Sequence, residues 1–97
     1  MGQSATVYKF RLYVAGDAQN SIEALGNLHD ICNRLLPDRH AIEVIDVFQE
    51  PKRALADGVF MTPALVKLSP EPSRRIIGTL SQTKTVLLAL GLPASSP

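Results

Sequence analysis

The chain has 97 residues, of which 45% are hydrophobic, and this is enough for one domain with one core. Ten basic residues against nine acidic ones give a formal net charge of +1, which excludes a protein that binds nucleic acid or membranes through its overall field. With no leader-like start, no apolar run of about 18 residues and a single cysteine, Cys32, we expect a cytoplasmic protein without a membrane span or disulfide.

The first half of the chain has the pattern of a strand followed by a helix. Apolar and polar residues alternate from Val7 to Val14, which predicts a half-buried strand. Asn20 and Glu23 have the spacing of an N-terminal capping box and predict a helix from about Ser21 to Leu36. Within this helix apolar residues recur at spacings of three and four, and Pro37 cannot continue the helix.

A second strand is predicted from Ala41 to Phe48. This segment is so apolar that we expect an interior strand, covered on both faces by helices. Strand, helix and strand in succession predict a parallel βαβ unit with a right-handed crossover. Asp46 is costly inside such a strand unless it is hydrogen-bonded, so we expect its carboxylate to hold a loop or a helix N-terminus.

The second half of the chain is divided by prolines and glycines into four shorter elements. They are a helix from Pro51 to about Gly58, strands at 62–68 and 74–78, and a closing helix from Ser81 to Leu90 that Gly91 ends. Together the elements form a single α/β domain over residues 1–97, with an ordered core at about 6–92 and a flexible tail at 93–97.

The order βαβαββα, with a proline at the start of the third strand, resembles the thioredoxin fold. That resemblance implies a site beside Pro63, which is commonly cis. A thioredoxin needs a thiolate at the N-terminus of its first helix, where exposed amides and the helix dipole lower the thiol pKa. The corresponding loop at 15–20 has no cysteine, and Cys32 lies on the apolar stripe of the helix, so we expect an inert core thiol.

Other site chemistries have weaker support. His29 and Cys32 stand at positions i and i+3 of one helix, but a structural zinc site wants four ligands. Ser21 resembles the glutathione-activating hydroxyl of glutathione transferases, whose helical second domain is not found in these 97 residues. A thioredoxin-like or glutathione-transferase-like redox protein stays the alternative function, and we expect no catalytic residue, cofactor or metal ligand.

Several segments together resemble the KaiB family of clock proteins from about Tyr8 to Gly91. They are Leu12–Gly16, Val44–Val47, Thr62-Pro63, Arg74–Gly78 and Leu80-Ser81. The resemblance implies a non-enzymatic regulatory protein that binds a KaiC-type RecA-like hexameric ATPase and autokinase, and modulates circadian-like timing or stress adaptation. It also leaves open a KaiB-like sensor domain related to that of a histidine kinase.

The same resemblance implies contact residues and an oligomeric state. We expect partner contacts from the second helix, at Lys52 and Arg53, and from a strand face on which Lys67, Arg74 and Arg75 would form a small basic patch. The protein is expected to be a monomer or a weak homo-oligomer, a dimer or tetramer. In the cyanobacterial oscillator, proteins of this family also capture a second partner, KaiA. Departures from the cyanobacterial pattern at Glu23, Glu43 and Thr79 argue against that capture here.

KaiB proteins are also known to adopt two folds, the thioredoxin-like one and a ground state of order βαββααβ that differs in the C-terminal half. The resemblance makes five positions structural or switch residues: Asp46, Pro63, Gly78, Ala89 and Gly91. Ala89 stands where the cyanobacterial pattern has glycine, which favours a helix interior by ~1 kcal/mol, and Gly91 suits the position that closes a helix. We therefore expect the thioredoxin-like state.

Overall fold

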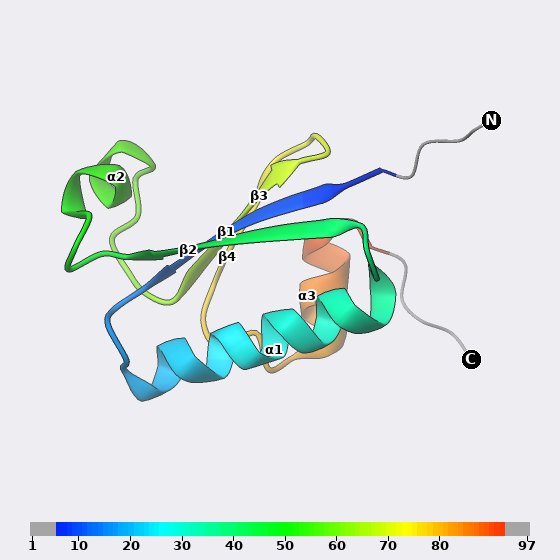
Figure 1. Cartoon of the computed structure of the whole chain (residues 1–97), viewed down its shortest axis with the longest axis horizontal. Coiled ribbons are helices and arrows are strands. Elements are labelled where there is room, and N and C mark those ends of the chain that lie inside the picture. Colours follow the sequence, from blue (N-terminus) through cyan, green and yellow to red (C-terminus); the bar gives the residue numbers. More distant parts are fainter. Residues whose placement is uncertain (1–5, 93–97) are drawn as a thin grey trace.

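The computed structural model describes residues 6–92 and has the predicted order βαβαββα (Figure 1). The predicted tail at 93–97 lies outside the described residues. The elements are β1 (Tyr8–Val14), α1 (Gln19–Leu35), β2 (His40–Asp46), α2 (Pro51–Ala56), β3 (Ala64–Ser69), β4 (Arg74–Ile77) and α3 (Thr83–Leu90). No helix among these is long and apolar enough to cross a membrane.

The four strands form one mixed sheet in the order β2-β1-β3-β4. β1 pairs in parallel with β2, as the βαβ pattern predicts, and pairs antiparallel with β3, which pairs antiparallel with β4. The prediction that the second strand is interior was wrong, because the sheet continues from β1 through β3 and leaves β2 at one edge. Val44 is accordingly 44% exposed, and Ile45 is the residue of β2 that is fully buried.

Helices cover the two faces of the sheet unequally (Figure 1). α1 and α3 lie on one face and form the larger core with Phe10, Leu12 and Leu65 of the sheet. α2 lies at one end on the other face, where a smaller cluster contains Tyr13, Ile45, Ala54, Val59, Ala64 and Val66. Alternate residues of each strand therefore belong to different cores, as the period of two in β1 indicates.

The start of α1 differs from the predicted capping box. The amides of Ser21 and Ile22 donate to the carbonyl of Ala18, so the helix begins at Gln19 and its cap has no side-chain hydrogen bond. Asn20 already lies inside the first turn and is exposed, which is why the predicted box with Glu23 does not form. The closing helix likewise begins after Gln82 and not after Ser81.

The C-terminal ends of α2 and α3 use the same motif, as predicted from their glycines. Gly58 (φ 69°) and Gly91 (φ 73°) adopt the left-handed conformation that an L side chain disfavours. The amide of the next residue, Val59 or Leu92, donates to a carbonyl five residues earlier, at 2.8 and 2.9 Å respectively. These Schellman motifs end both helices and bury the residue after the glycine.

Two further positions have the structural roles expected of them. Asp46 Oδ1 accepts hydrogen bonds from the amides of Gly16 at 3.1 Å and Phe48 at 2.9 Å, so it holds the loops beyond β1 and β2. The Thr62-Pro63 bond is cis, and the carbonyl of Pro63 accepts the amide of Gly78 at 2.9 Å. Ala89 lies inside α3, so this is the thioredoxin-like arrangement, and a second fold stays a prediction.

Candidate functional site

The basic residues predicted to form one patch lie on different faces of the sheet. Lys67 of β3 is paired with Arg74 of β4, and Val66 with Arg75. Because successive residues of a strand point to opposite faces, Arg74 shares the α3 face with Lys67 whereas Arg75 points to the α2 face. The predicted single patch was therefore wrong, since the Arg-Arg pair is divided between the two faces.

Lys67 is a buried structural residue. Its side chain is 4% exposed, and Nζ donates a 2.9 Å hydrogen bond to the carbonyl of Leu90 at the end of α3. Nζ also lies 5.8 Å from the centre of the Tyr8 ring. Burial, and secondarily the charge of Arg74, lower the pKa of Lys67. A cation at a helix C-terminus is favourable, but this one is out of reach of a partner, so its predicted contact role was wrong.

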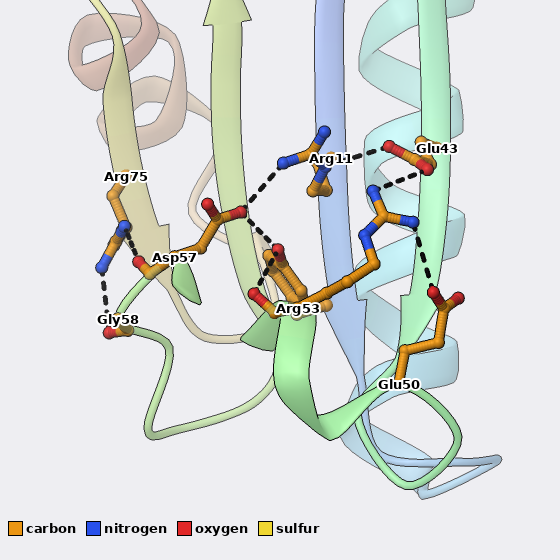
Figure 2. A network of polar contacts seen from close by, with 8 residues as sticks. Arg11, Glu43, Glu50, Arg53, Asp57, Gly58 and Arg75 are labelled. Carbon is orange, nitrogen blue, oxygen red and sulfur yellow. Dashed lines mark hydrogen bonds and ion pairs between the residues drawn. The ribbon is translucent and has the colours of Figure 1, made fainter. Parts of the chain in front are cut away.

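A polar network joins α2 to the sheet around Asp57 (Figure 2). Its carboxylate accepts a hydrogen bond from the Tyr13 hydroxyl and lies 2.9 Å from Nη1 of Arg11. Arg11 Nε in turn lies 2.9 Å from Oε1 of Glu43, its cross-strand neighbour on β2. The Tyr13 hydrogen bond and then Arg11 lower the pKa of Asp57, although its partial burial acts in the opposite direction.

Arg53 belongs to the same network and is largely neutralised by it. Its Nη2 lies 2.9 Å from Glu43 Oε2, and its Nη1 lies 3.4 Å from Glu50 Oε1. Glu43 therefore accepts from both Arg11 and Arg53, and these two hydrogen bonds lower its pKa. On α2, Lys52 is exposed, and the ion pairs of the described part of the chain do not include it, so it is the cation of this helix that a partner can meet.

Arg75 reaches α2 from the opposite side. Its guanidinium donates to two carbonyls at the end of that helix, Asp57 O through Nη2 and Gly58 O through Nη1, the second at 3.1 Å (Figure 2). These carbonyls carry the partial negative charge of the helix C-terminus. Arg75 thus fixes the last turn of α2 to β4, a role that its position in an Arg-Arg pair does not indicate.

Exposed apolar side chains occur on α2 and on the segments directly before and after it. We call this group the α2 surface: Phe48 is 75% exposed, Leu55 65%, Phe60 80% and Met61 63%. Beside Lys52, a hollow of about 320 Å³ is lined by residues 49–53. Sequence reasoning did not name these four residues, two of which stand between Gly58 and Pro63.

The positions that redox or metal chemistry would need are structural. Cys32 has no exposed surface, which confirms its predicted place in the core, and burial raises its pKa to about 11. Ser21 is 2% exposed, and its hydroxyl accepts the amide of Ala15 at 3.0 Å, so it closes the loop after β1. Among residues 6–92 no three His, Cys, Asp or Glu side chains stand together as metal ligands, and His29 is exposed while Cys32 is buried.

Comparison with solved structures supports the fold. The N-terminal domain of SasA from Synechococcus elongatus aligns with a TM-score of 0.73 at 19% identity, covering 100% of this chain and 95% of that one. Chloroplastic thioredoxin z aligns with a TM-score of 0.71 at 15% identity, covering 86% of this chain and 75% of that one. The architecture is thus thioredoxin-like, as predicted.

Sequence comparison identifies the family. A circadian clock protein KaiB3 of Synechocystis sp. is 42% identical over 82 residues, 84% of this chain and 80% of that protein. A circadian clock oscillator protein KaiB of Prochlorococcus marinus is 46% identical over 85 residues, 88% of this chain and 71% of that protein. The family model described as the KaiB domain matches residues 11–92, and the chain belongs to the KaiB family.

Proposed function

We propose that this protein is a non-catalytic regulator that binds a hexameric RecA-like ATPase of the KaiC type through the α2 surface. The observation that carries the proposal is the exposure of four large apolar side chains on and beside a six-residue helix. Single exposed apolar side chains are common on protein surfaces, whereas several of them in one region are typical of an interaction site. The family membership supplies the class of partner.

The rigidity of α2 supports a docking role for it. The helix is held at both ends, by Arg53 with Glu43 and Glu50 near its start and by Arg75 and Asp57 at its end. A surface that is already ordered loses less conformational entropy when it binds. Lys52 adds an exposed charge that a carboxylate of the partner can meet.

The biological output follows from the partner. The relatives are named as circadian clock proteins, so modulation of circadian-like timing is the first expectation and stress adaptation the second. The substitutions noted at Glu23, Glu43 and Thr79 speak against capture of a KaiA-type protein, and this too stays a prediction. A cytoplasmic location and a monomeric or weakly oligomeric state belong to the same proposal.

A matched pair of leucine variants tests the proposal. The protein is mixed with a KaiC-type hexamer in the presence of ATP or ADP, and the complex is separated by size-exclusion chromatography. Leu55→Asp should abolish co-elution, whereas Leu88→Asp should not, because Leu88 is 78% exposed on α3 and outside the α2 surface. Absence of a complex with either nucleotide would refute the proposal that a KaiC-type ATPase is the partner. Equal binding by both variants would refute the proposal that the α2 surface makes the contact.

A further inference from the structure

The outer edge of β4 carries backbone groups that no other strand of the described chain pairs with. β4 pairs with β3 alone and is the last strand of the sheet. The amide of Gly78 donates to Pro63 O, which makes this pair a hydrogen-bonded one. Because hydrogen-bonded and non-hydrogen-bonded pairs alternate in an antiparallel ladder, Arg75 and Ile77 turn their amides and carbonyls outward. An extended chain can add to this edge.

An apolar hollow lies beside the edge, between β4 and α3. Its volume is about 170 Å³, and its apolar lining includes Ile76, Leu80 and Val86. Leu80 and Val86 are 5% and 3% exposed, so the hollow reaches the margin of the larger core. Thr85 and Ser81 line it as well. One apolar side chain from an added strand has room here.

The segment that runs from β4 through α3 is positively charged. From Arg74 to Leu92 the sequence has three basic residues and no acidic one, although the whole chain has a net charge of only +1. Arg74 and Lys84 are exposed, and neither takes part in the ion pairs of residues 6–92. Within residues 6–92, the side-chain hydrogen bond of Arg74 is to the carbonyl of the preceding Ser73. The edge therefore favours an acidic partner.

We propose that the β4 edge binds an extended acidic segment of a partner protein, which adds to the sheet as a fifth strand. Arg74 and Ile76 are two residues apart and share the α3 face of β4. The bound segment would accordingly place a carboxylate opposite Arg74 and an apolar side chain, two residues away, in the hollow. Its backbone would pair with the outward groups of Arg75 and Ile77.

The other edge of the sheet does not suit the same ligand. β2 has no lysine or arginine that could meet an acidic strand, and its charged residues are the two carboxylates Glu43 and Asp46. Nucleic acid is a poorer match for β4, because few cations surround it and the bases would not use the open amides. The β4 edge borders the hollow against α3, whereas α2 lies on the opposite face, so this inference does not rest on the proposed function.

Nuclear magnetic resonance of the full ¹⁵N-labelled chain provides the test. The probe is a short capped peptide of Thr-Glu-Thr-Val repeats, in which glutamate and valine fall on one face. It should shift the amide signals of Arg75 and Ile77 and slow their hydrogen exchange. A peptide of the same composition with glutamate and valine adjacent, and a peptide with lysine for glutamate, should each bind several-fold more weakly.

Two variants separate the charge from the backbone pairing. Arg74→Glu should weaken the peptide about fivefold, the effect of roughly 1 kcal/mol of charge interaction, while Lys52→Glu on α2 should leave the affinity unchanged. Ile77→Pro removes an outward amide without removing a ladder bond to β3, and should also weaken the peptide about fivefold. Circular dichroism of each variant verifies that it is folded.

Four outcomes would overturn the proposal. They are unchanged amide exchange at Arg75 and Ile77, equal affinity for the lysine peptide, binding of single-stranded poly(dT) at the same site with equal affinity, and signals at this edge that change on dilution of the protein alone. The last would mean that a second copy of the chain occupies the edge. If Leu55→Asp no longer binds the ATPase but still binds the peptide, the proposal for the β4 edge holds independently of the proposed function.

Discussion

Alanine in place of either of two glycines should change stability in opposite directions. Gly91 has a φ of +73° after the last residue of α3, and an added Cβ would lie 3.9 Å from Lys67 Nζ, an ordinary contact. Gly26 lies inside α1, and its Cβ would have no heavy atom within 4 Å. Sterically, therefore, both sites accept alanine, and only the backbone conformation distinguishes them.

The magnitudes follow from that conformation. An L-residue in the left-handed region costs about 1–2 kcal/mol, and alanine offsets part of this by restricting the unfolded chain, so Gly91→Ala should destabilise by about 1 kcal/mol. In a helix interior alanine is better than glycine by about 0.8–1 kcal/mol, so Gly26→Ala should stabilise by that amount. For a domain of this size, 1 kcal/mol changes Tm by roughly 4–8 °C.

Urea denaturation followed by far-ultraviolet circular dichroism measures both changes. The two variants should have the same dependence of unfolding free energy on urea as the parent, and their midpoints should lie on either side of its midpoint. A Gly91→Ala protein as stable as the parent would refute the reasoning, because it would mean that the chain does not leave α3 through a left-handed residue at this position. Changes of the same sign at both glycines would refute it equally.

Three further predictions concern buried or paired groups. The pKa of Asp57 in the folded protein is lower than its ordinary value of 3.8. The ionised carboxylate therefore stabilises the fold above pH 3.8, and this contribution is lost as the pH falls through the lowered pKa. Asp57→Asn should accordingly lose less stability than the parent between pH 7 and pH 3 in urea titrations. The pKa of Lys67 in the folded protein is lower than its ordinary value of 10.5, so the unfolded chain holds this proton to a higher pH. The stability of the parent relative to Lys67→Met should therefore rise as the pH approaches 10.5. A stability difference that does not change with pH would contradict the burial of the charge. Cys32 should react with a thiol reagent only at the rate of unfolding, and rapid labelling of the native protein would show that the thiol is accessible.

Local features of the sequence were sufficient for the order of the elements. The period of two in β1 and the apolar spacing of α1 are set by which side chains must leave water, and these periods distinguish strand from helix. Gly58 and Gly91 mark helix ends because few other residues adopt their conformation at low cost. The position of Cys32 on an apolar stripe was sufficient to predict a buried thiol.

The tertiary structure decided which surfaces those elements present. The sequence of an apolar strand does not show whether the strand has one neighbour or two. The edge position of β2 depends on the pairing of β3 with β1, which are far apart in the sequence. The same pairing put Lys67 beneath the end of α3. Charge is visible in a sequence, but whether a partner can reach it depends on long-range packing, which no local pattern contains.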